Sequence, residues 1–233
     1  KELSAVPQKE AGLPVSVPEE LVSTLFSPNS VTPCVACIGV APTGEVFAGV
    51  DQIGSLGKGG GKGRIIRLVD EDHDGISDIR TEYALIDNPR GIVPVGNKLY
   101  VLHTKWGEGT KFDGMFLSVL EDQDGDGVAD GPPRHLVREI STRKYNQARG
   151  VDHTTNGIRM GIDGWIYVAV GDFGFVNATG TDGKKLTMFG GGIIRVRPDG
   201  TELETYASGL RNIYDVAIDP FMNVFTRGNT NDG

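Results

Sequence analysis

A strand-and-turn unit recurs four times along this chain of 233 residues and limits the folds open to it. Each copy has an apolar approach, a polar turn and a strand that ends in an aromatic residue. These aromatic residues are Phe47, Tyr100, Tyr167 and Phe225, which lie 53, 67 and 58 positions apart. A glycine-led strand follows the first three copies, at Gly63, Gly114 and Gly192. Repeats of four short strands, roughly 40–50 residues long, are typical of β-propeller blades.

We therefore expect an all-β chain with the fold of a partial β-propeller. Three blades fit residues 36–86, 89–140 and 156–210, and half of a fourth follows; inserted loops make them longer than the usual repeat. Because a propeller needs at least about four blades to close, we expect about three and a half blades of a roughly six-bladed propeller, truncated at the C-terminus. A β-sandwich of about eight to ten strands is the competing fold, but the regular paired hairpins favour the propeller. No segment of useful length has helical periodicity.

The first part of the chain differs from the rest because it is rich in proline and weakly patterned. We interpret residues 1–33 as a leader, in which residues 20–26 form a possible closing strand, and residues 34–233 as propeller blades. No apolar run approaches the ~20 residues of a membrane span, and the chain does not open like a signal peptide, which is absent or already removed. The net charge of −8 argues against binding to nucleic acid, which needs a basic surface.

The two cysteines, Cys34 and Cys37, form an isolated CxxC pair. A zinc site would need a second pair, and a c-type haem attachment would need a histidine where the chain has Ile38. Residues three apart on a strand point to opposite faces. We therefore expect two small buried residues rather than a disulfide or a redox pair.

Two loops share the spacing D-x-D-x-D-G-x-x-D. Their aspartates are Asp70, Asp72, Asp74 and Asp78 in the first loop, and Asp122, Asp124, Asp126 and Asp130 in the second. Carboxylates at positions 1, 3 and 5, a glycine turn at 6 and a backbone carbonyl at 7 (Ile76 and Val128) form the ligand pattern of calcium loops. Thr81 and Pro133 replace the final Glu of an EF-hand, and the strand-flanked loops resemble those of integrin-type propellers. We predict two structural Ca²⁺ sites on outer hairpins; the alternative is an acidic turn without an ion.

The densest polar stretch that strand formation does not explain runs over residues 152–159. It contains His153, Asn156 and Arg159. Asp172 follows the next strand, and Arg211 and Asn212 come later. Loops that enter the innermost strands of a propeller line its channel, so His153, Asp172 and Arg211 are expected on one face. The other histidines, His73, His103 and His135, are expected on the surface or in loops.

These residues resemble a motif of soluble quinoprotein glucose and sorbosone dehydrogenases. That family carries a His before a G-x-D-G-x-I/L-Y strand, then a Gly-Asp pair and a later G-x-R-N-P segment. The matching positions are His153, residues 161–167, residues 171–172 and residues 209–213. Over residues 15–233, and best over 150–233, the chain is closer still to dehydrogenase-like propeller domains of large exported planctomycete-type proteins. Those proteins often continue into a haem-bearing CxxCH cytochrome c domain, and they imply a periplasmic or extracellular location.

The resemblance implies a dehydrogenase for a small sugar or aldehyde that uses pyrroloquinoline quinone (PQQ). His153 would be the general base, a hydride would pass to the quinone, and Asp172 would orient His153 and stabilise its imidazolium. Arg211 would pair with an anionic group of the cofactor, a task that suits its fork of donors. Asn212, Asn156 and Arg159 are the other candidate cofactor-binding residues. A downstream cytochrome c domain would accept the electrons.

The chain departs from this family where Ile213 replaces the proline of G-x-R-N-P, and the remaining basic residues of the family's cofactor site are expected on later blades. Two other functions stay open. One is a non-catalytic calcium-binding propeller that binds carbohydrate or protein. The other is a calcium-dependent hydrolase such as a lactonase, for which Asn156, Asn212 and Asp215 provide part of a metal-ligand set. In the simplest alternative, His153 only forms a hydrogen bond to a loop, and Arg211 forms an ion pair with Asp215 or Asp232.

Overall fold

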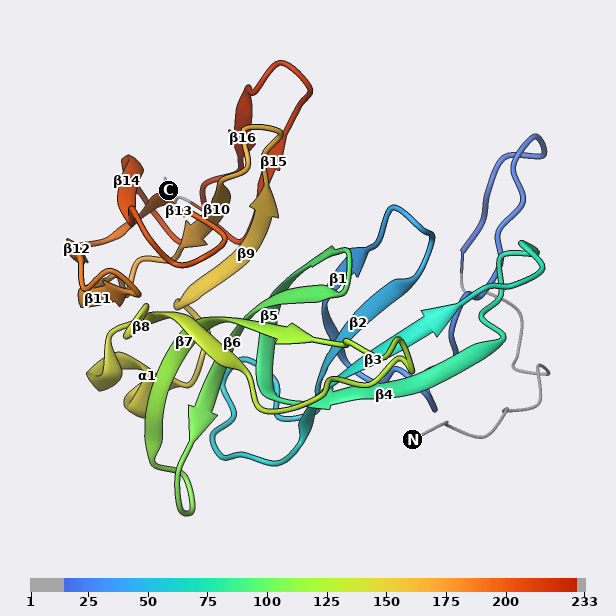
Figure 1. The fold of residues 1–233 in the computed structure, drawn as a ribbon, viewed down its shortest axis with the longest axis horizontal. Helices are drawn as coiled ribbons and strands as arrows, with labels where there is room; N and C mark the ends of the chain where they lie inside the picture. The colour runs from blue at the N-terminus through green and yellow to red at the C-terminus, as the bar shows by residue number, and fades with distance from the viewer. Residues whose placement is uncertain (1–14, 230–233) are drawn as a thin grey trace.

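The structure, a computed structural model, describes residues 15–229, which fold into successive antiparallel sheets (Figure 1). The first blade contains β1 (Val35–Val40), β2 (Val46–Asp51), β3 (Gly63–Val69) and β4 (Ile79–Leu85). The second contains β5 (Asp87–Val95), β6 (Lys98–Trp106), β7 (Phe112–Glu121) and β8 (Arg134–Arg138). The third contains β9 (Thr155–Met160), β10 (Ile166–Val170), β13 (Gly191–Val196) and β14 (Glu204–Leu210). A two-stranded sheet of β15 (Val216–Ile218) and β16 (Val224–Thr226) follows.

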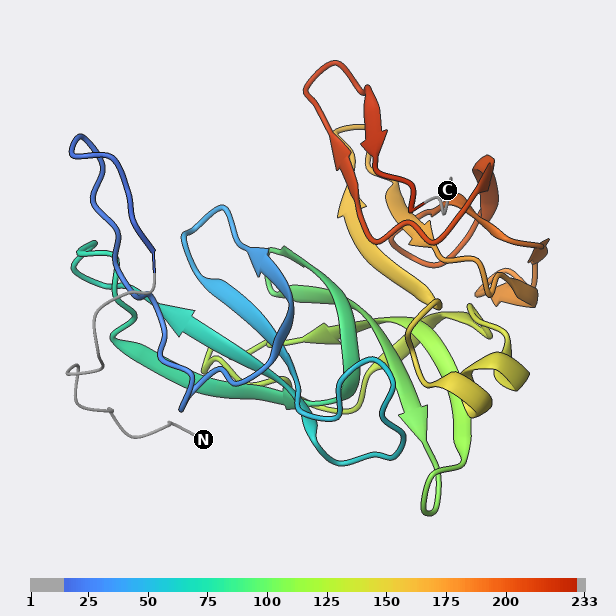
Figure 2. The ribbon, with the colours of Figure 1, turned by 180° about the vertical axis from the view of Figure 1, so that it is seen from behind.

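These sheets confirm the predicted partial propeller of three blades and half a fourth. The predicted blade limits differ from the observed strand limits by no more than two residues. Each blade begins with its inner strand, and β5 packs between β1 and β9, while β9 also contacts β15 (Figures 1 and 2). The segments that enter these inner strands therefore come together at one end of the molecule.

An insertion lengthens the third blade. β11 (Phe175–Gly180) and β12 (Lys185–Met188) lie between β10 and β13 in the chain, but they join the sheet of the second blade. The connection is made where β11 pairs with β8, with Thr179 opposite Arg138 and Gly180 opposite Val137. The third blade is thereby tied to the second through its edge as well as through its core.

Two predictions about local structure were wrong. Residues 20–26 form no strand: they lie beside the β3–β4 connection, where Thr24 Oγ1 donates to Gly75 O, and Val22 is 91% exposed. A short helix, α1 (Arg143–Arg149), was not expected. Its seven residues bury only Asn146, so no apolar periodicity marks it in the sequence. Contacts of Asn146 with Ser141 Oγ and Gly150 O hold the helix in place.

Apolar side chains fill the spaces between the blades. β10 is buried at every position, as expected for a central strand covered on both faces. Its Val168 and Val170 share one cluster with Leu117 of β7 and Ile194 of β13. Burial of such side chains contributes roughly 1.5–3 kcal/mol each. Within residues 15–229, no helix has the length and apolar character needed to cross a membrane.

The structure also tests the expectations for the histidines outside the site and for the two cysteines. His73 is exposed in a loop, as predicted, whereas His103 lies on β6 and is only 3% exposed, and His135 is half-buried on β8. The two cysteines are free, as predicted, but Cys34 is exposed rather than buried. Cys37 is partly buried, and burial raises the pKa of its thiol to about 12, which suppresses the reactive thiolate.

Candidate functional site

His153 lies in the segment that leads into the inner strand β9, and it meets Asp172 from the segment after β10. Nδ1 of His153 is 2.5 Å from Oδ1 of Asp172. The side chains of His153 and Asp172 are 17% and 28% exposed, so the pair is mostly buried but still accessible to a small molecule. Because an ionised carboxylate only accepts hydrogen bonds, Nδ1 of His153 carries a proton and donates it to Asp172.

Gly171 allows these two segments to approach so closely. Its N–H donates to Thr154 O at 3.1 Å, and the N–H of Phe173 donates to His153 O at 3.1 Å. A Cβ at position 171 would lie 2.3 Å from Thr154 O and 2.4 Å from His153 O. Only glycine leaves room for this backbone contact, which sets Asp172 beside His153.

Helix α1 supplies one wall of the site. The ring of His153 is stacked near that of Phe173, with centroids 5.5 Å apart, and Tyr145 of α1 also contacts Phe173. Arg149 lies 5.8 Å from the centroid of the same ring and donates to Asp152 Oδ2 at 2.8 Å. Asp152 Oδ2 is also 3.3 Å from Nε2 of His153. The unexpected helix therefore controls the charge and the packing around the imidazole.

Arg211 and Asn212 reach the same place from the segment before β15. Nε of Arg211 is 3.7 Å from Oδ2 of Asp172. Asn212 Oδ1 is buried and has no hydrogen-bond partner among the described residues. The structure thus brings together His153, Asp172 and Arg211, which were expected on one face of the propeller, and it places Asn212 beside them.

Asn156 and Arg159 have partners inside the fold. Asn156 is buried, and its amide nitrogen donates to Thr154 O and Ile213 O. Arg159 forms an ion pair with Asp215. The alternative pairing of Arg211 with Asp215 is therefore wrong, because Arg159 occupies that carboxylate; Asp232 lies outside the described residues.

Arg90 is a residue of this site that the sequence analysis missed. It lies near the start of the inner strand β5, is 5% exposed and donates twice to Asn156 Oδ1, at 2.8 and 3.2 Å. Its guanidinium also lies 5.5 Å from the ring centroid of Tyr214. Among the described residues no carboxylate lies within 4.0 Å of it. A buried cation with only neutral partners is costly and marks a place where an anion would be favourable.

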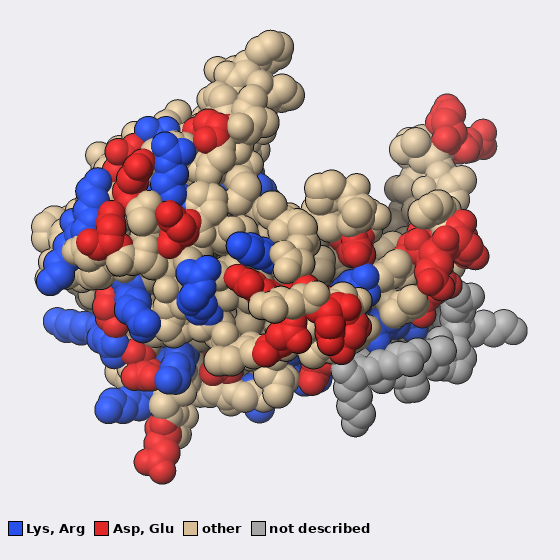
Figure 3. All heavy atoms as spheres, viewed as in Figure 1, with Lys and Arg blue, Asp and Glu red and all other residues tan. Residues whose placement is uncertain are grey.

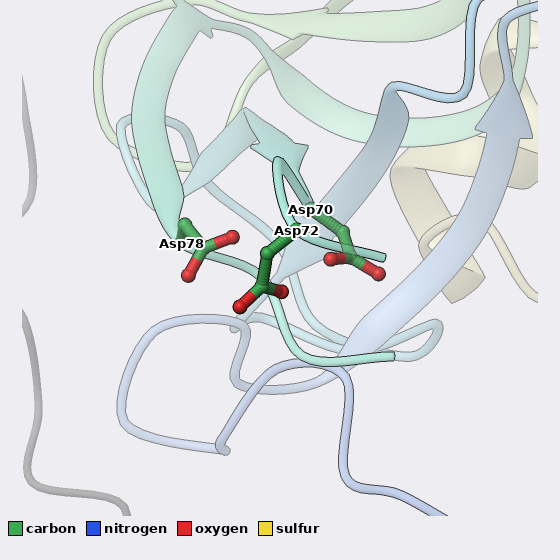
Figure 4. A group of neighbouring side chains, drawn as sticks. All are labelled: Asp70, Asp72 and Asp78. Carbon is green, nitrogen blue, oxygen red and sulfur yellow. The ribbon is translucent and has the colours of Figure 1, made fainter. Parts of the chain in front are cut away.

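The two acidic loops lie on outer hairpins, between β3 and β4 and between β7 and β8, as predicted. On the face shown in Figure 3, acidic side chains gather near the ends of these hairpins. In the first loop, oxygens of Asp70, Asp72 and Asp78 lie within 4.8 Å of one another, with Asp72 in the middle (Figure 4). Asp122, Asp124 and Asp130 form the equivalent group in the second loop.

Both loops fold in the same way. The N–H at position 6 donates to the first aspartate, at 2.9 Å for Gly75 and 3.0 Å for Gly127. These glycines have φ values of 86° and 84°, which explains why position 6 is glycine. The aspartates at position 5, Asp74 and Asp126, instead accept the N–H of Ile76 and Val128, both at 2.8 Å. The carboxylates that come together are thus those at positions 1, 3 and 9.

Solved structures with this architecture include enzymes. An aldose sugar dehydrogenase of Streptomyces coelicolor, solved with PQQ bound, has a TM-score of 0.54 at 18% identity, over 83% of this chain and 55% of that one. A Thermus thermophilus protein assigned as an oxidoreductase (glucose dehydrogenase) has a TM-score of 0.54 at 15% identity, over 84% and 58%. A gluconolactonase of Xanthomonas campestris has a TM-score of 0.50 at 15% identity, over 82% and 52%.

At these identities the likeness establishes the fold alone, which is that of a β-propeller. The chain spans between 52% and 58% of the length of these three structures. No curated protein matches the chain in sequence. Residues 40–233, which make up most of the chain, match a family described as a domain of unknown function. The chain therefore belongs to this family, DUF7133.

Proposed function

We propose that this chain forms part of a PQQ-dependent dehydrogenase that oxidises a small sugar or aldehyde, with His153 as its general base. The observation that carries the proposal is the bond between His153 and Asp172 at the end of the inner strands. A PQQ-bound aldose sugar dehydrogenase with the same fold supports it.

His153 is suited to removing a proton from a substrate hydroxyl through Nε2. Asp172 fixes the tautomer, keeps the ring in place against Phe173 and stabilises the imidazolium that forms. Asp152 lies close enough to Nε2 to stabilise the same cation, and its bond to Arg149 keeps its carboxylate in position. PQQ, when bound, supplies the two-electron acceptor for the substrate.

The residues around His153 fit an anionic cofactor such as PQQ. Arg90 is a buried cation without a carboxylate partner in the described part of the chain, and Arg211 lies 3.7 Å from Asp172 and donates to Asn229 O. These two residues would hold carboxylate groups, and the unpartnered Asn212 Oδ1 would accept a hydrogen bond from a donor on the ligand. Asn156 and Arg159 would not contact the cofactor themselves. Asn156 orients Arg90, and Arg159 neutralises Asp215.

We also propose that each acidic loop holds a structural Ca²⁺ ion. Three carboxylates at short range in each loop repel one another without a cation, and Asp70 Oδ1 is buried without a partner among the described residues. Hard oxygen ligands on a tight glycine turn suit Ca²⁺. The position of both loops on outer hairpins assigns these ions to stability rather than to the reaction.

The proposal also includes the cellular location of the enzyme and its electron acceptor. We place it outside the cytoplasm, where free Ca²⁺ is abundant enough for loops with dissociation constants of ~10⁻⁴–10⁻³ M. We further propose a cytochrome c domain as the electron acceptor, which follows from the family resemblance.

Oxidation of aldoses and aldehydes by the complete gene product, loaded with Ca²⁺ and PQQ, tests this function through reduction of an artificial dye. We expect turnover that His153→Ala abolishes while the circular dichroism spectrum stays unchanged. Hydrolysis of gluconolactone without any dye reduction would overturn the proposal in favour of a lactonase. The structure gives that alternative less support, because Asp215 and Asn156 are already engaged by Arg159 and Arg90.

A further inference from the structure

A cavity of about 410 Å³ lies between the first two blades, and none of the residues around His153 lines it. One wall comes from the glycine-rich β2–β3 connection and from residues 85–87. The other comes from residues 103–105 and from the segment after the second acidic loop, with Pro132, Pro133 and His135. Its volume is in the range of pockets that bind small molecules.

A chain of buried hydrogen bonds leads to this cavity. His103 Nδ1 is 2.9 Å from the carbonyl of Thr104, His103 Nε2 is 2.8 Å from Ser118 Oγ, and Ser118 Oγ is 2.8 Å from His135 Nδ1. A carbonyl only accepts, so Nδ1 of His103 carries a proton and donates it. Complete burial lowers the pKa of His103 to about 4, so the ring is neutral and its Nε2 is an acceptor.

The direction of the remaining bonds then follows. Ser118 Oγ–H donates to His103 Nε2, and Ser118 Oγ accepts from Nδ1–H of His135. Burial also lowers the pKa of His135, which is therefore neutral at neutral pH and has its lone pair on Nε2. Phe116 stacks on the His135 ring at 4.0 Å and fixes its orientation. Among the described residues Nε2 has no hydrogen-bond partner, and it is accessible to solvent.

Asp87 provides a second acceptor in the cavity. Burial raises the pKa of Asp87, and its carboxylate accepts the backbone N–H of Gly61 at 2.7 Å through Oδ1 and that of Trp106. The nearby Lys105 is paired with Asp113 at 3.3 Å. The walls between these polar groups are apolar, from Pro132, Pro133 and Leu85, which is 72% exposed.

We propose that this cavity binds a neutral polyhydroxylated molecule of about monosaccharide size, at a site separate from His153. His135 Nε2, an acceptor without a donor among the described residues, and the Asp87 carboxylate call for a ligand that donates hydrogen bonds. Exposed proline and leucine surfaces suit the C–H faces of a sugar ring. A metal ion fits less well, since the acidic loops are where three or more His, Cys, Asp or Glu side chains of the described residues converge. An anion would meet the Asp87 carboxylate and the lone pair of His135.

The second acidic loop is connected to this cavity by the chain itself. Pro132 and Pro133 follow Asp130 by two and three residues, and the N–H of Ala129 donates to Tyr83 O in the first blade at 3.0 Å. Ca²⁺ bound in this loop, as proposed above, would therefore also order one wall of the cavity.

Titration of D-glucose, D-galactose, D-mannose and myo-inositol into the complete gene product, free of PQQ and carrying His153→Ala, tests the proposal. The readout is the long-range ¹H–¹⁵N spectrum of labelled histidines. We expect His135 to be protonated on Nδ1, and at least one of these probes to shift its Nε2 signal with saturation. Use of the His153 variant separates this site from the proposed active site, so either one can fail alone.

Matched variants make the test specific. His135→Phe keeps the stacking on Phe116 but removes Nε2, and Asp87→Asn removes the charged acceptor; each is expected to weaken binding at least about tenfold. Lys144→Ala, an exposed residue on α1, is expected to change nothing. If none of the four probes shifts the His135 signal at 100 mM, or if binding survives in both variants, the proposal is wrong. Preferential binding of ethanolamine or of gluconate would also overturn it.

Discussion

Asp172 links the candidate base to the candidate cofactor anchor: Oδ1 lies 2.5 Å from His153 Nδ1, and Oδ2 lies 3.7 Å from Arg211 Nε. One carboxylate thus accepts the imidazole proton and also attracts the guanidinium. Both effects depend on its negative charge.

Asp172→Asn therefore tests this link directly. We expect kcat for dye-linked sugar oxidation to fall about 10²–10⁴-fold, because the amide does not stabilise the imidazolium and permits the wrong tautomer. Asp113→Asn, a partly exposed acid on the β6–β7 hairpin that pairs with Lys105, is the matched control and should leave kcat unchanged. Equal activity of both variants would show that Asp172 has no part in the reaction.

Gly171→Ala tests whether the close backbone contact positions the pair. A Cβ at this position would lie 2.3 Å from Thr154 O, so the two segments must move apart. We expect a loss of about 1–3 kcal/mol in the free energy of unfolding, measured with urea, together with loss of turnover. Gly107→Ala, whose Cβ would meet only Lys111 O at 3.7 Å, should retain both.

Ca²⁺ removal is expected to destabilise the protein. With dissociation constants of ~10⁻⁴–10⁻³ M, 10 mM Ca²⁺ would stabilise the fold by about 1.4–2.7 kcal/mol per loop. We expect EDTA to lower the melting temperature, and Asp70→Asn or Asp122→Asn to remove part of the Ca²⁺ response. Glu108→Gln, in the exposed β6–β7 turn, should keep the full response. A melting temperature that changes neither with added Ca²⁺ nor with EDTA would refute the two ion sites.

The buried His103 predicts a pH dependence of stability. Burial lowers the pKa of His103 from 6.5 to about 4. Between these pH values, His103 is therefore protonated in the unfolded chain but neutral in the folded protein. The free energy of unfolding should therefore fall by about 3 kcal/mol as the pH drops from 6.5 to 4, and should not change through this group above pH 6.5. Urea denaturation across this range measures it.

Two variants identify the group responsible. His103→Phe should be less stable at pH 7 because Ser118 loses a partner, but its stability should depend less on pH. His73→Gln should keep the wild-type slope, since His73 is exposed. An unchanged slope in His103→Phe would assign the acid sensitivity to another group.

The sequence predicted the blades well because their information is local and repeated. A strand pair that ends at an aromatic residue and turns at a glycine is visible in each copy, whatever lies around it. The grouping of His153, Asp172 and Arg211 was also predictable, since His153 and Arg211 precede inner strands and Asp172 follows the strand that pairs antiparallel with β9. Gly171 stands directly before Asp172, which is consistent with its role in the close backbone contact that sets Asp172 beside His153.

Other features depend on contacts between distant segments. Helix α1 has too few apolar residues to be seen, and its place beside Phe173 follows from tertiary packing. Arg90 is separated from Asn156 by 66 residues, and only the packing of β5 against β9 shows that it is a buried cation. The burial of His103 depends on Ser118 from the next strand. A signal for Arg90 did exist in the sequence: it stands near the start of an inner strand, close to the place that the polar stretch occupies at β9.

Calorimetric titration of PQQ into the complete gene product, with Ca²⁺ present, tests the central claim most directly. We predict saturable binding that Arg211→Ala and Arg90→Ala each weaken at least about tenfold, because each removes a cation from the proposed anion site. Lys144→Ala, an exposed cation on α1, should leave the affinity unchanged. Absence of binding by a folded, calcium-loaded protein would contradict the account and would favour a propeller that binds carbohydrate or protein without catalysis.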